Sequence, residues 1–566
     1  MYTMKKLSYI TGLLCLIIAV GCTKDFEEIN RDSQGFDSDE VSAKYFLTNS
    51  QVGLYAPSRF EYWRAHLINS DRYAGHVDFG FNQGWWAGEL GYKYDVAYTD
   101  AAYGWLAGYF GNIKAFADFT KEGGEFENQY MFAMSLIMKS LYFQMYTDTF
   151  GMVPFSEAGV DGILTPKYDA QIDIYKGIIA DLDQAMTIIG DAERTGLGID
   201  DVGENDVYCG GDLQLWKTLA NSLKLRLGMR ALGAPGADFA QTTINQALNQ
   251  PLLDATTGSV TMSKDYVISE WTSSSYGDVW HDFAGLGSKW TMGEPFINLL
   301  DDNNDPRLPV YANPAPGGSF VFTNIKEGGS YTDPNYQERV DFIESTLITA
   351  QADYTLTVDG DDIIIDLPAG QYIGQPIRLN ADIMPYVRFE MFSTPGDAIL
   401  QPRGDKATGY PEIILSSAES YFLQAEAVVR GITSGDAQEL MAKGIIEAMK
   451  LWEISEGDAN NYISNSAIAD ISTGTTEEKL EKIALQRWLA SYTDGFEAWA
   501  IVRDTGYPSS LAAGVSNPVI FGLGTLNGDY PQRLRYGSGA QANPNYAQAV
   551  SQQGPDNQAT KLWWAK

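Results

Sequence analysis

Cysteine and histidine are scarce in this sequence. Its 566 residues include three of each. Cys15 lies in an apolar N-terminal segment and Cys22 directly follows it, so Cys209 is the one cysteine in the body of the chain. If Cys22 is modified, no intrachain disulfide is available, and a thiol with no histidine nearby in the sequence favours a structural role. We therefore expect the apolar core to supply the stability.

Positive charge and long apolar runs are also scarce. Lys and Arg number 39 against 73 Asp and Glu, which gives a net charge of −34. Such a chain repels nucleic acid phosphates and anionic lipid surfaces, so we expect no nucleic acid partner. After the N-terminal segment, no run reaches the roughly 18 apolar residues of a transmembrane helix. With 45% hydrophobic residues, the sequence predicts a water-soluble body with a large core.

The N-terminal segment is typical of a secretory signal. Lys5 and Lys6 precede a run of about eight apolar residues at 13–20, which is too short to span a bilayer. Val20-Gly21-Cys22 resembles the lipobox of bacterial lipoproteins, which implies a signal peptide at 1–21 and an acylated Cys22; an ordinary signal with a chance cysteine is the alternative. The polar, acidic residues 22–40 predict a flexible tether, and their acids resemble a signal for the outer face of the outer membrane.

Helical periodicity dominates most of the remaining chain. Apolar residues recur at three- and four-residue spacing in segments 128–151, 169–189, 213–233, 414–431, 437–452 and 477–492. Trp216, Leu219 and Leu223 fit the W-x2-L-x3-L spacing of a tetratricopeptide helix. Paired helices are therefore expected both early and late in the chain, and we expect Trp216, Trp488 and Trp499 in the core.

The pattern changes between about residues 252 and 410, where Gly, Pro, Asn and Asp interrupt short alternating runs. Residues 354–367 predict a β-hairpin with Asp359-Gly360 in its turn. The predicted fold class is thus mainly α: a tetratricopeptide-like scaffold of helix pairs with an irregular, loop-rich insertion that contains short β-hairpins. We expect one domain at 41–566, with 41–251 and 411–566 as scaffold and 252–410 as insertion.

Four segments, in order, resemble one protein family. They are 148–159 with 166–185, then 411–431, 486–508, and 530–550 with Leu562-Trp563-Trp564. Together they are similar to SusD/RagB nutrient-binding lipoproteins, although Gly537-Ser538-Gly539 stands where the family often has Pro and then Glu. The resemblance implies a lipid-anchored, surface-exposed protein of the outer membrane. It also implies capture of an oligosaccharide or related nutrient for a SusC-like TonB-dependent transporter.

Two stretches outside the regular helices combine aromatic platforms with polar groups, as carbohydrate sites do. They are 76–95 and 270–290. Adjacent tryptophans between glycines cannot share one helical face, so Trp85 and Trp86 are the preferred candidates. The alternative is that these aromatics fill the junction between scaffold and insertion. The candidate ligand-binding residues are Trp85, Trp86, Asn82, Asp78, Trp271, Tyr276, Trp280 and Trp290.

Signals for metals and catalysis are weak. Asp301, Asn303 and Asp305 have the odd spacing of a calcium loop, but its glycine and final glutamate are missing. Some members of the resembled family bind calcium, yet we expect a capped turn here and no cofactor. The sequence has no Walker A, dinucleotide or G-x-S-x-G motif, but a glycosidase needs only two carboxylates, so this absence says little about hydrolysis. The family resemblance is the main reason that we expect no enzyme. A surface glycoside hydrolase and a peptide-binding tetratricopeptide scaffold remain the alternatives.

Overall fold

The computed structural model describes most of the chain after the predicted tether. The described residues are 41–55, 59–79, 92, 95–262, 276–284, 289–400, 410 and 412–565. The predictions for Cys22, Asn82, Trp85, Trp86 and Trp271 therefore lie outside the described residues. Across the described part, no helix combines the length and apolarity that a bilayer span requires.

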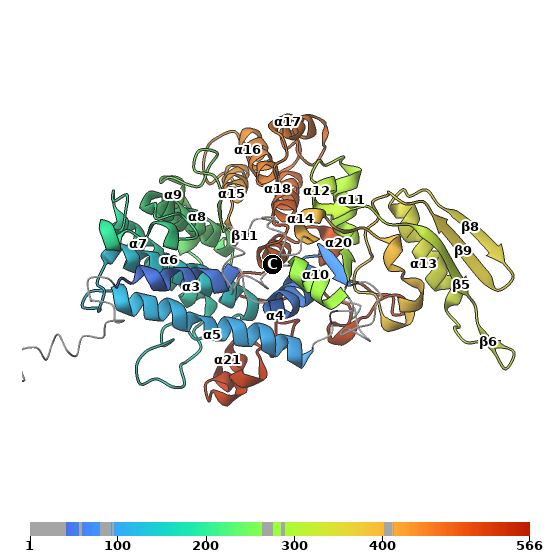
Figure 1. Ribbon diagram of the computed structural model, residues 1–566, viewed down its shortest axis with the longest axis horizontal. Coiled ribbons are helices and arrows are strands. Elements are labelled where there is room, and N and C mark those ends of the chain that lie inside the picture. Colours follow the sequence, from blue (N-terminus) through green and yellow to red (C-terminus); the bar gives the residue numbers. More distant parts are fainter. Residues whose placement is uncertain are drawn as a thin grey trace, which may run out of the picture.

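Helices from the first half of the chain form one side of the molecule (Figure 1). Neighbouring helices pack in sequence order, α5 on α6, α6 on α7, α7 on α8 and α8 on α9. A π-helical segment, Tyr62–Asp71, leads from this group toward the centre. The elements are α3 (Lys44–Tyr55), α4 (Arg59–Glu61), α5 (Val96–Thr120), α6 (Gln129–Phe150), α7 (Gln171–Ile189), α8 (Leu213–Ala231) and α9 (Phe239–Leu248).

A second group of helices comes from the last third of the chain. Helix α15 packs on α16 and α18, and it also contacts α8, which joins the two groups. The mainly helical fold class is confirmed by this arrangement. The elements are α15 (Ser417–Val429), α16 (Ala437–Lys450), α17 (Glu456–Asn465), α18 (Thr476–Ala490), α19 (Gly495–Thr505), α20 (Ser509–Ala512) and α21 (Tyr546–Gln553).

Local sequence explains where these helices begin and end. Asn128 caps α6 by accepting from the backbone N–H groups of Tyr130 and Met131. The helix ends at Gly151, whose φ of +86° a side chain would disfavour. Helix α18 begins with a capping box between Thr475 and Glu478. The helices predicted at 128–151, 169–189, 213–233, 414–431, 437–452 and 477–492 are confirmed within a few residues.

Residues 252–410 contain short helices and strands between irregular segments. The helices are α10 (Tyr276–Ala284), α11 (Glu294–Asp302), α12 (Leu308–Tyr311), α13 (Tyr336–Thr349) and α14 (Asp397–Leu400). The two-stranded antiparallel sheets pair β1 (Val77–Phe79) with β3 (Trp290–Met292), β2 (Val260–Met262) with β11 (Glu412–Leu415), β4 (Ala312–Asn313) with β10 (Thr394–Pro395), and β6 (Lys326–Glu327) with β7 (Ser330–Tyr331).

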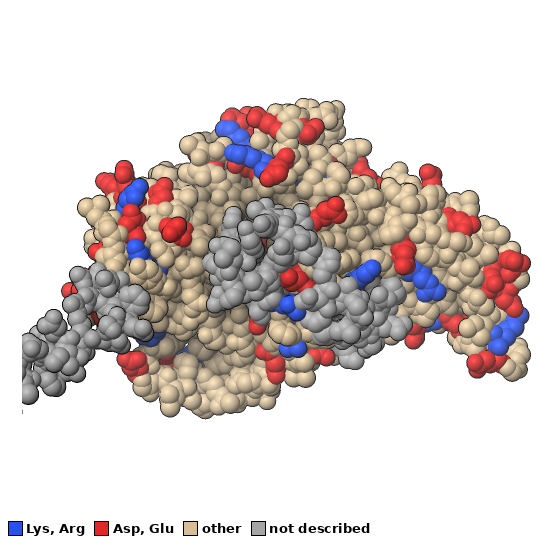
Figure 2. All heavy atoms as spheres, viewed as in Figure 1, with Lys and Arg blue, Asp and Glu red and all other residues tan. Residues whose placement is uncertain are grey.

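One three-stranded antiparallel sheet lies at the opposite end from α7 in Figure 1, and both acidic and basic side chains are exposed at that end in Figure 2. Its order is β5 (Gly318–Thr323), β9 (Asp362–Leu367), β8 (Thr355–Asp359). The predicted hairpin is confirmed, since β8 pairs with β9 and Asp359 lies opposite Asp362. The two connecting residues are therefore Gly360 and Asp361, one position beyond the predicted pair. Gly360 adopts the positive φ, +65°, that such tight turns need.

The core includes the three tryptophans that helical spacing placed there. Trp216, Trp488 and Trp499 each have 0% of their surface exposed. Cys209 is buried as well, and burial raises the pKa of its thiol well above the ordinary value, which agrees with the predicted structural role.

A buried network of charged side chains, which we call the arginine network, joins the two helical groups. Arg226 and Arg230 of α8 bind carboxylates from α6, α15 and α19. The Arg226 Nε atom lies 2.7 Å from Glu419 Oε1, and Arg230 Nη1 lies 2.6 Å from Asp148 Oδ2. Arg230 also pairs with Glu497. Because these groups are nearly inaccessible to water, each depends on its partners for charge compensation.

Candidate functional site

The two candidate stretches meet at the centre of the molecule. Strands β1 and β3 pair so that Asp78 lies opposite Thr291 and Phe79 opposite Trp290. Helix α10, which carries Tyr276 and Trp280, contacts the π-helical segment and α14. Four of the eight candidate residues, Asp78, Tyr276, Trp280 and Trp290, are thus brought into one region, although the sequence separates them by up to about 200 positions.

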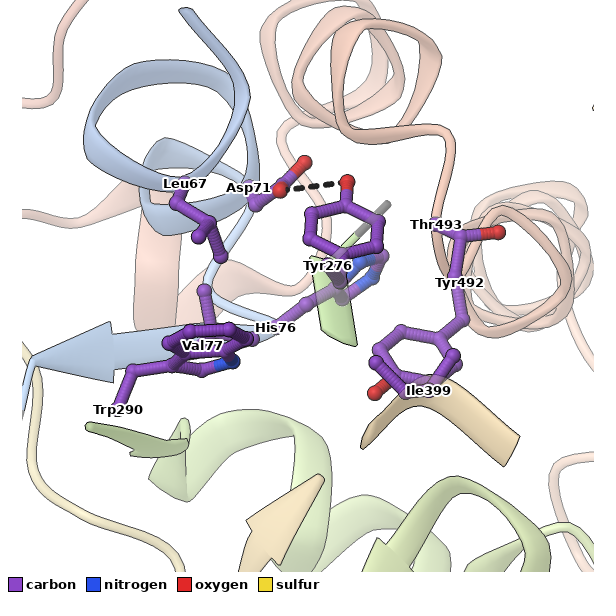
Figure 3. A pocket seen from close by; sticks show the side chains of 9 residues that line it. All are labelled: Leu67, Asp71, His76, Val77, Tyr276, Trp290, Ile399, Tyr492 and Thr493. Carbon is purple, nitrogen blue, oxygen red and sulfur yellow. Dashed lines mark hydrogen bonds between the residues drawn. The ribbon is translucent and has the colours of Figure 1, made fainter. Parts of the chain in front are cut away.

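A small cavity lies in this region (Figure 3). It leaves about 10 Å³ of free space, room for about one water molecule. The Tyr276 hydroxyl donates a hydrogen bond of 2.7 Å to Asp71 Oδ2 at its edge. This space is too small for a saccharide, and the side chains around it belong to the core. Its lining residues are Leu67, Asp71, His76, Val77, Tyr276, Trp290, Ile399, Tyr492 and Thr493.

The four described candidates are buried. Trp280 is 9% exposed, Tyr276 3%, Trp290 1% and Asp78 0%. Trp280 and Trp290 pack edge to face, with ring centroids 4.9 Å apart. Asp78 Oδ2 accepts a hydrogen bond of 3.1 Å from the backbone N–H of Arg378. Tyr276, Trp280 and Trp290 therefore form an aromatic wall in the core, and contact of any of the four residues with a ligand stays a prediction.

A cation borders this aromatic wall. The Lys289 ammonium lies 5.2 Å from the ring centroid of Phe389 and 6.0 Å from that of Trp280. Such a cation holds its position by attraction to the electron-rich faces of both rings.

Asp71 is a buried acid that the sequence analysis missed. Burial raises its pKa to about 7, the Tyr276 hydrogen bond acts in the opposite direction, and the nearby Asp494 and Glu412 carboxylates raise it further. Tyr62, which donates a hydrogen bond to Glu412, packs edge to face on Tyr276. Asp71 is the last residue of the π-helical segment and follows the polar residues Asn69 and Ser70, so no local pattern in the sequence marks it as a buried acid.

His76 is another titratable group in the lining. Burial lowers its pKa to about 3, although a hydrogen bond to the Trp488 carbonyl oxygen opposes the shift. The imidazole is therefore neutral, and its Nε2–H donates to that oxygen over 3.2 Å. Of the described lining residues, Asp71 alone carries a carboxyl group, whereas glycoside hydrolysis ordinarily uses a pair.

The calcium-like spacing at 301–305 begins in the last turn of α11 and continues into the connection to α12. Asp305 engages the Arg307 guanidinium through both oxygens, over 2.9 and 2.6 Å. The Asn303 side chain donates to the Leu299 carbonyl and accepts from Ser466. Among the residues that the structure describes, no group of three or more His, Cys, Asp or Glu is arranged to hold a metal ion.

Comparison with known proteins gives a match over most of the chain. A family model, SusD-like, described as "Starch-binding associating with outer membrane", matches residues 37–358 and 350–536. No curated protein matches the sequence.

Solved structures show the same fold. One, a chitin-binding protein, is 23% identical with a TM-score of 0.68, and the alignment covers 93% of this chain and 100% of that one. A chitin-binding SusD homologue from Flavobacterium johnsoniae is 22% identical, with a TM-score of 0.65 and coverage of 92% and 98%. A SusD homologue from Bacteroides vulgatus is 20% identical, with a TM-score of 0.67 and coverage of 92% and 97%.

Proposed function

The chain belongs to the SusD-like family, and from this membership we propose that it captures an oligosaccharide at the outer membrane and delivers it to a SusC-like TonB-dependent transporter. The observation that carries the proposal is the family match, which extends from residue 37 to residue 536. The family is described as starch-binding and as associating with the outer membrane.

Attachment to the membrane through Cys22 is part of the proposal. The lipobox-like Val20-Gly21-Cys22 and the acidic tether at 22–40 support it. Each buried methylene contributes about 0.8 kcal/mol, so several acyl chains on one cysteine hold a protein stably on a bilayer. The tether would let the folded body move over the membrane surface while it stays attached.

The ligand-binding residues that we propose are Trp85, Trp86, Trp271 and Asn82. In support, the paired strands β1 and β3 and helix α10 hold the ends of both candidate stretches in one region. The buried ring pair Trp280 and Trp290 gives that region a rigid base. Rigid support lowers the entropy lost when a ligand binds.

The proposed action is binding and hand-over, with no bond broken. The test is isothermal titration calorimetry of the purified protein against oligosaccharides, with product analysis of the same samples. The panel starts with chitin and starch oligosaccharides, because two similar structures are described as chitin-binding and the family as starch-binding. Heat of binding without new products supports the proposal.

Two outcomes would overturn it. Release of shorter products would indicate the glycoside hydrolase alternative. Absence of heat with every glycan, together with binding of a peptide, would indicate a peptide-binding scaffold. Co-purification with a tagged SusC-like transporter tests the delivery step separately.

A further inference from the structure

An open hollow lies on the insertion, beside the three-stranded sheet and α13 at the right of Figure 1. Its volume is about 710 Å³, within the range of about 300 to 1,000 Å³ that is typical of small-molecule sites. None of its lining residues lines the central cavity of Figure 3. The lining residues are Val321, Phe322, Thr323, Ile325, Thr332, Asp333, Pro334, Asn335, Arg339, Ala381, Asp382, Pro385, Tyr386 and Arg388.

One group of polar side chains in the hollow is held in place by mutual contacts. Asp333 accepts from Arg339 Nη1 over 2.6 Å, from the backbone N–H of Asn335 over 2.8 Å, and from the Tyr386 hydroxyl. Arg339 also pairs with Asp382 over 3.5 Å. Although burial acts in the opposite direction, hydrogen bonds led by that of Tyr386 hold the pKa of Asp333 below its ordinary value. The wall thus presents a fixed, ionised carboxylate.

A second group keeps its hydrogen-bonding capacity. The Arg388 guanidinium lies 5.6 Å from the ring centroid of Phe322, and it forms no ion pair with any described residue. The attraction between the guanidinium and the ring orients the Arg388 side chain and does not use its N–H donors. The hydroxyl of Thr323 and the side-chain amide of Asn335 also line the hollow, and neither takes part in a hydrogen bond between described residues.

We propose that this hollow is a second saccharide-binding site, and that it takes one or two units of a neutral oligosaccharide. Arg388, Thr323 and Asn335 are its binding groups. A neutral ligand fits because the two arginines of the lining are balanced by Asp333 and Asp382. Sugar hydroxyls both donate and accept, which matches a wall that offers guanidinium, hydroxyl, amide and carboxylate groups together.

The apolar part of the lining completes the match. Val321 and Ile325 are exposed by 47% and 57%, and Pro334 and Pro385 lie in the same wall. These surfaces can pack against the C–H faces of a pyranose ring, which are apolar. The ligand class rests on the proposed function, whereas the location rests on the hollow alone. A site here would hold a long glycan at a second point, and two linked contacts raise the overall affinity.

The test is photo-cross-linking of the full chain in detergent. The probes are neutral hexasaccharides of glucose, xylose, mannose and N-acetylglucosamine that carry a diazirine, with an oligogalacturonate probe as the acidic comparison. Cross-linked peptides are identified by mass spectrometry, with and without excess unlabelled glycan. We expect at least one neutral probe to label peptides from 318–340 and 381–390, in a manner that the unlabelled glycan suppresses.

Variants distinguish a binding site from incidental proximity. We expect Arg388→Ala to lower labelling of these peptides at least five-fold, and the double variant Thr323→Ala with Asn335→Ala to do the same. The matched control is Lys326→Ala, which removes an exposed cation of the same region that pairs with Asp361 and lies outside the lining. The control should change labelling by less than two-fold. Equal thermal unfolding of all variants shows that each is folded.

The remaining outcomes each overturn the inference. Suppressible labelling confined to other peptides rejects this site and leaves the proposed function standing. Labelling of the hollow by the acidic probe alone rejects the neutral ligand class. Absence of suppressible labelling anywhere in the chain rejects the site and the proposed function together.

Discussion

Replacing Glu497 with glutamine should destabilise the protein strongly, because this carboxylate compensates three buried arginines. Glu497 pairs with Arg230, and its oxygens lie 3.7 Å from Arg226 Nε and 3.7 Å from Arg487 Nη2. Although burial acts in the opposite direction, Arg226, Arg230 and Arg487 lower the pKa of Glu497 from 4.5 to about 2. At 1.36 kcal/mol per unit, that shift corresponds to about 3 kcal/mol of stability.

A second line of reasoning gives a similar magnitude. Removing one partner of a buried ion pair typically costs about 3 to 5 kcal/mol, because the remaining charge stays buried without compensation. We therefore expect Glu497→Gln to lower the free energy of unfolding by about 3 kcal/mol at pH 7. The measurement is urea unfolding followed in parallel by circular dichroism and tryptophan fluorescence, with coincident transitions.

A control and a pH series make the prediction specific. Glu439→Gln removes a carboxylate that is 62% exposed and pairs with Lys443 on the same helix. We expect it to cost less than about 0.5 kcal/mol. The folded-state pKa of Glu497 is lowered, so its contribution is present above pH 4.5 and disappears as the pH falls through about 2. A Glu497→Gln variant as stable as the control at pH 7 would refute the reasoning.

Three further predictions concern Asp71, the Cys209 thiol and the tryptophans at positions 85 and 86. Burial raises the pKa of Asp71 from 3.8 to about 7, so the stability that this carboxyl contributes is full below pH 3.8 and is lost as the pH rises through 7. The urea midpoint of Asp71→Asn should therefore rise relative to that of the wild type between pH 5 and pH 8. An equal difference between the two midpoints at both pH values would contradict this. Because the Cys209 thiol is buried, Ellman's reagent should react with it at least ~10-fold faster in denaturant than in buffer; equal rates would show that the thiol is accessible. The double variant Trp85→Ala with Trp86→Ala should weaken glycan binding, measured by calorimetry, about tenfold, or ~1.4 kcal/mol, and leave thermal unfolding nearly unchanged. A large loss of stability would instead indicate that both residues belong to the core.

The helical scaffold was predictable because its signals are local. The spacing of apolar residues and the stop at Gly151 define α6, and both signals lie in the helix or directly beside it. The same holds for Trp216, whose position in a tetratricopeptide-like pattern predicted its complete burial. The hairpin at 354–367 followed from alternation and a glycine turn, and only the turn residues were one position off.

The centre of the molecule was predicted only in part, because its contacts join distant segments. Aromatic content singled out Tyr276 and Trp290, but nothing in the sequence indicated that Tyr276 binds Asp71, 205 positions away. Aromatic side chains fill cores as well as binding surfaces, so composition alone could not show that Trp280 and Trp290 pack against each other. The hollow at Arg388 was missed for the same reason, since β5, α13 and residues 381–388 meet only in the folded chain.

Asp148 links helix α6 to residues that lie far away in the sequence. Its Oδ1 atom accepts from the Tyr175 hydroxyl and from Trp564 Nε1, each over 2.7 Å, while Arg503 Nη1 donates to its backbone carbonyl over 2.7 Å. In helical repeat arrays each repeat ordinarily contacts only its neighbours, and the cooperativity of unfolding breaks down in long arrays. Here one residue of α6 binds groups from positions up to 416 residues away. We expect the array to unfold as a single cooperative unit, so that it cannot be shortened repeat by repeat.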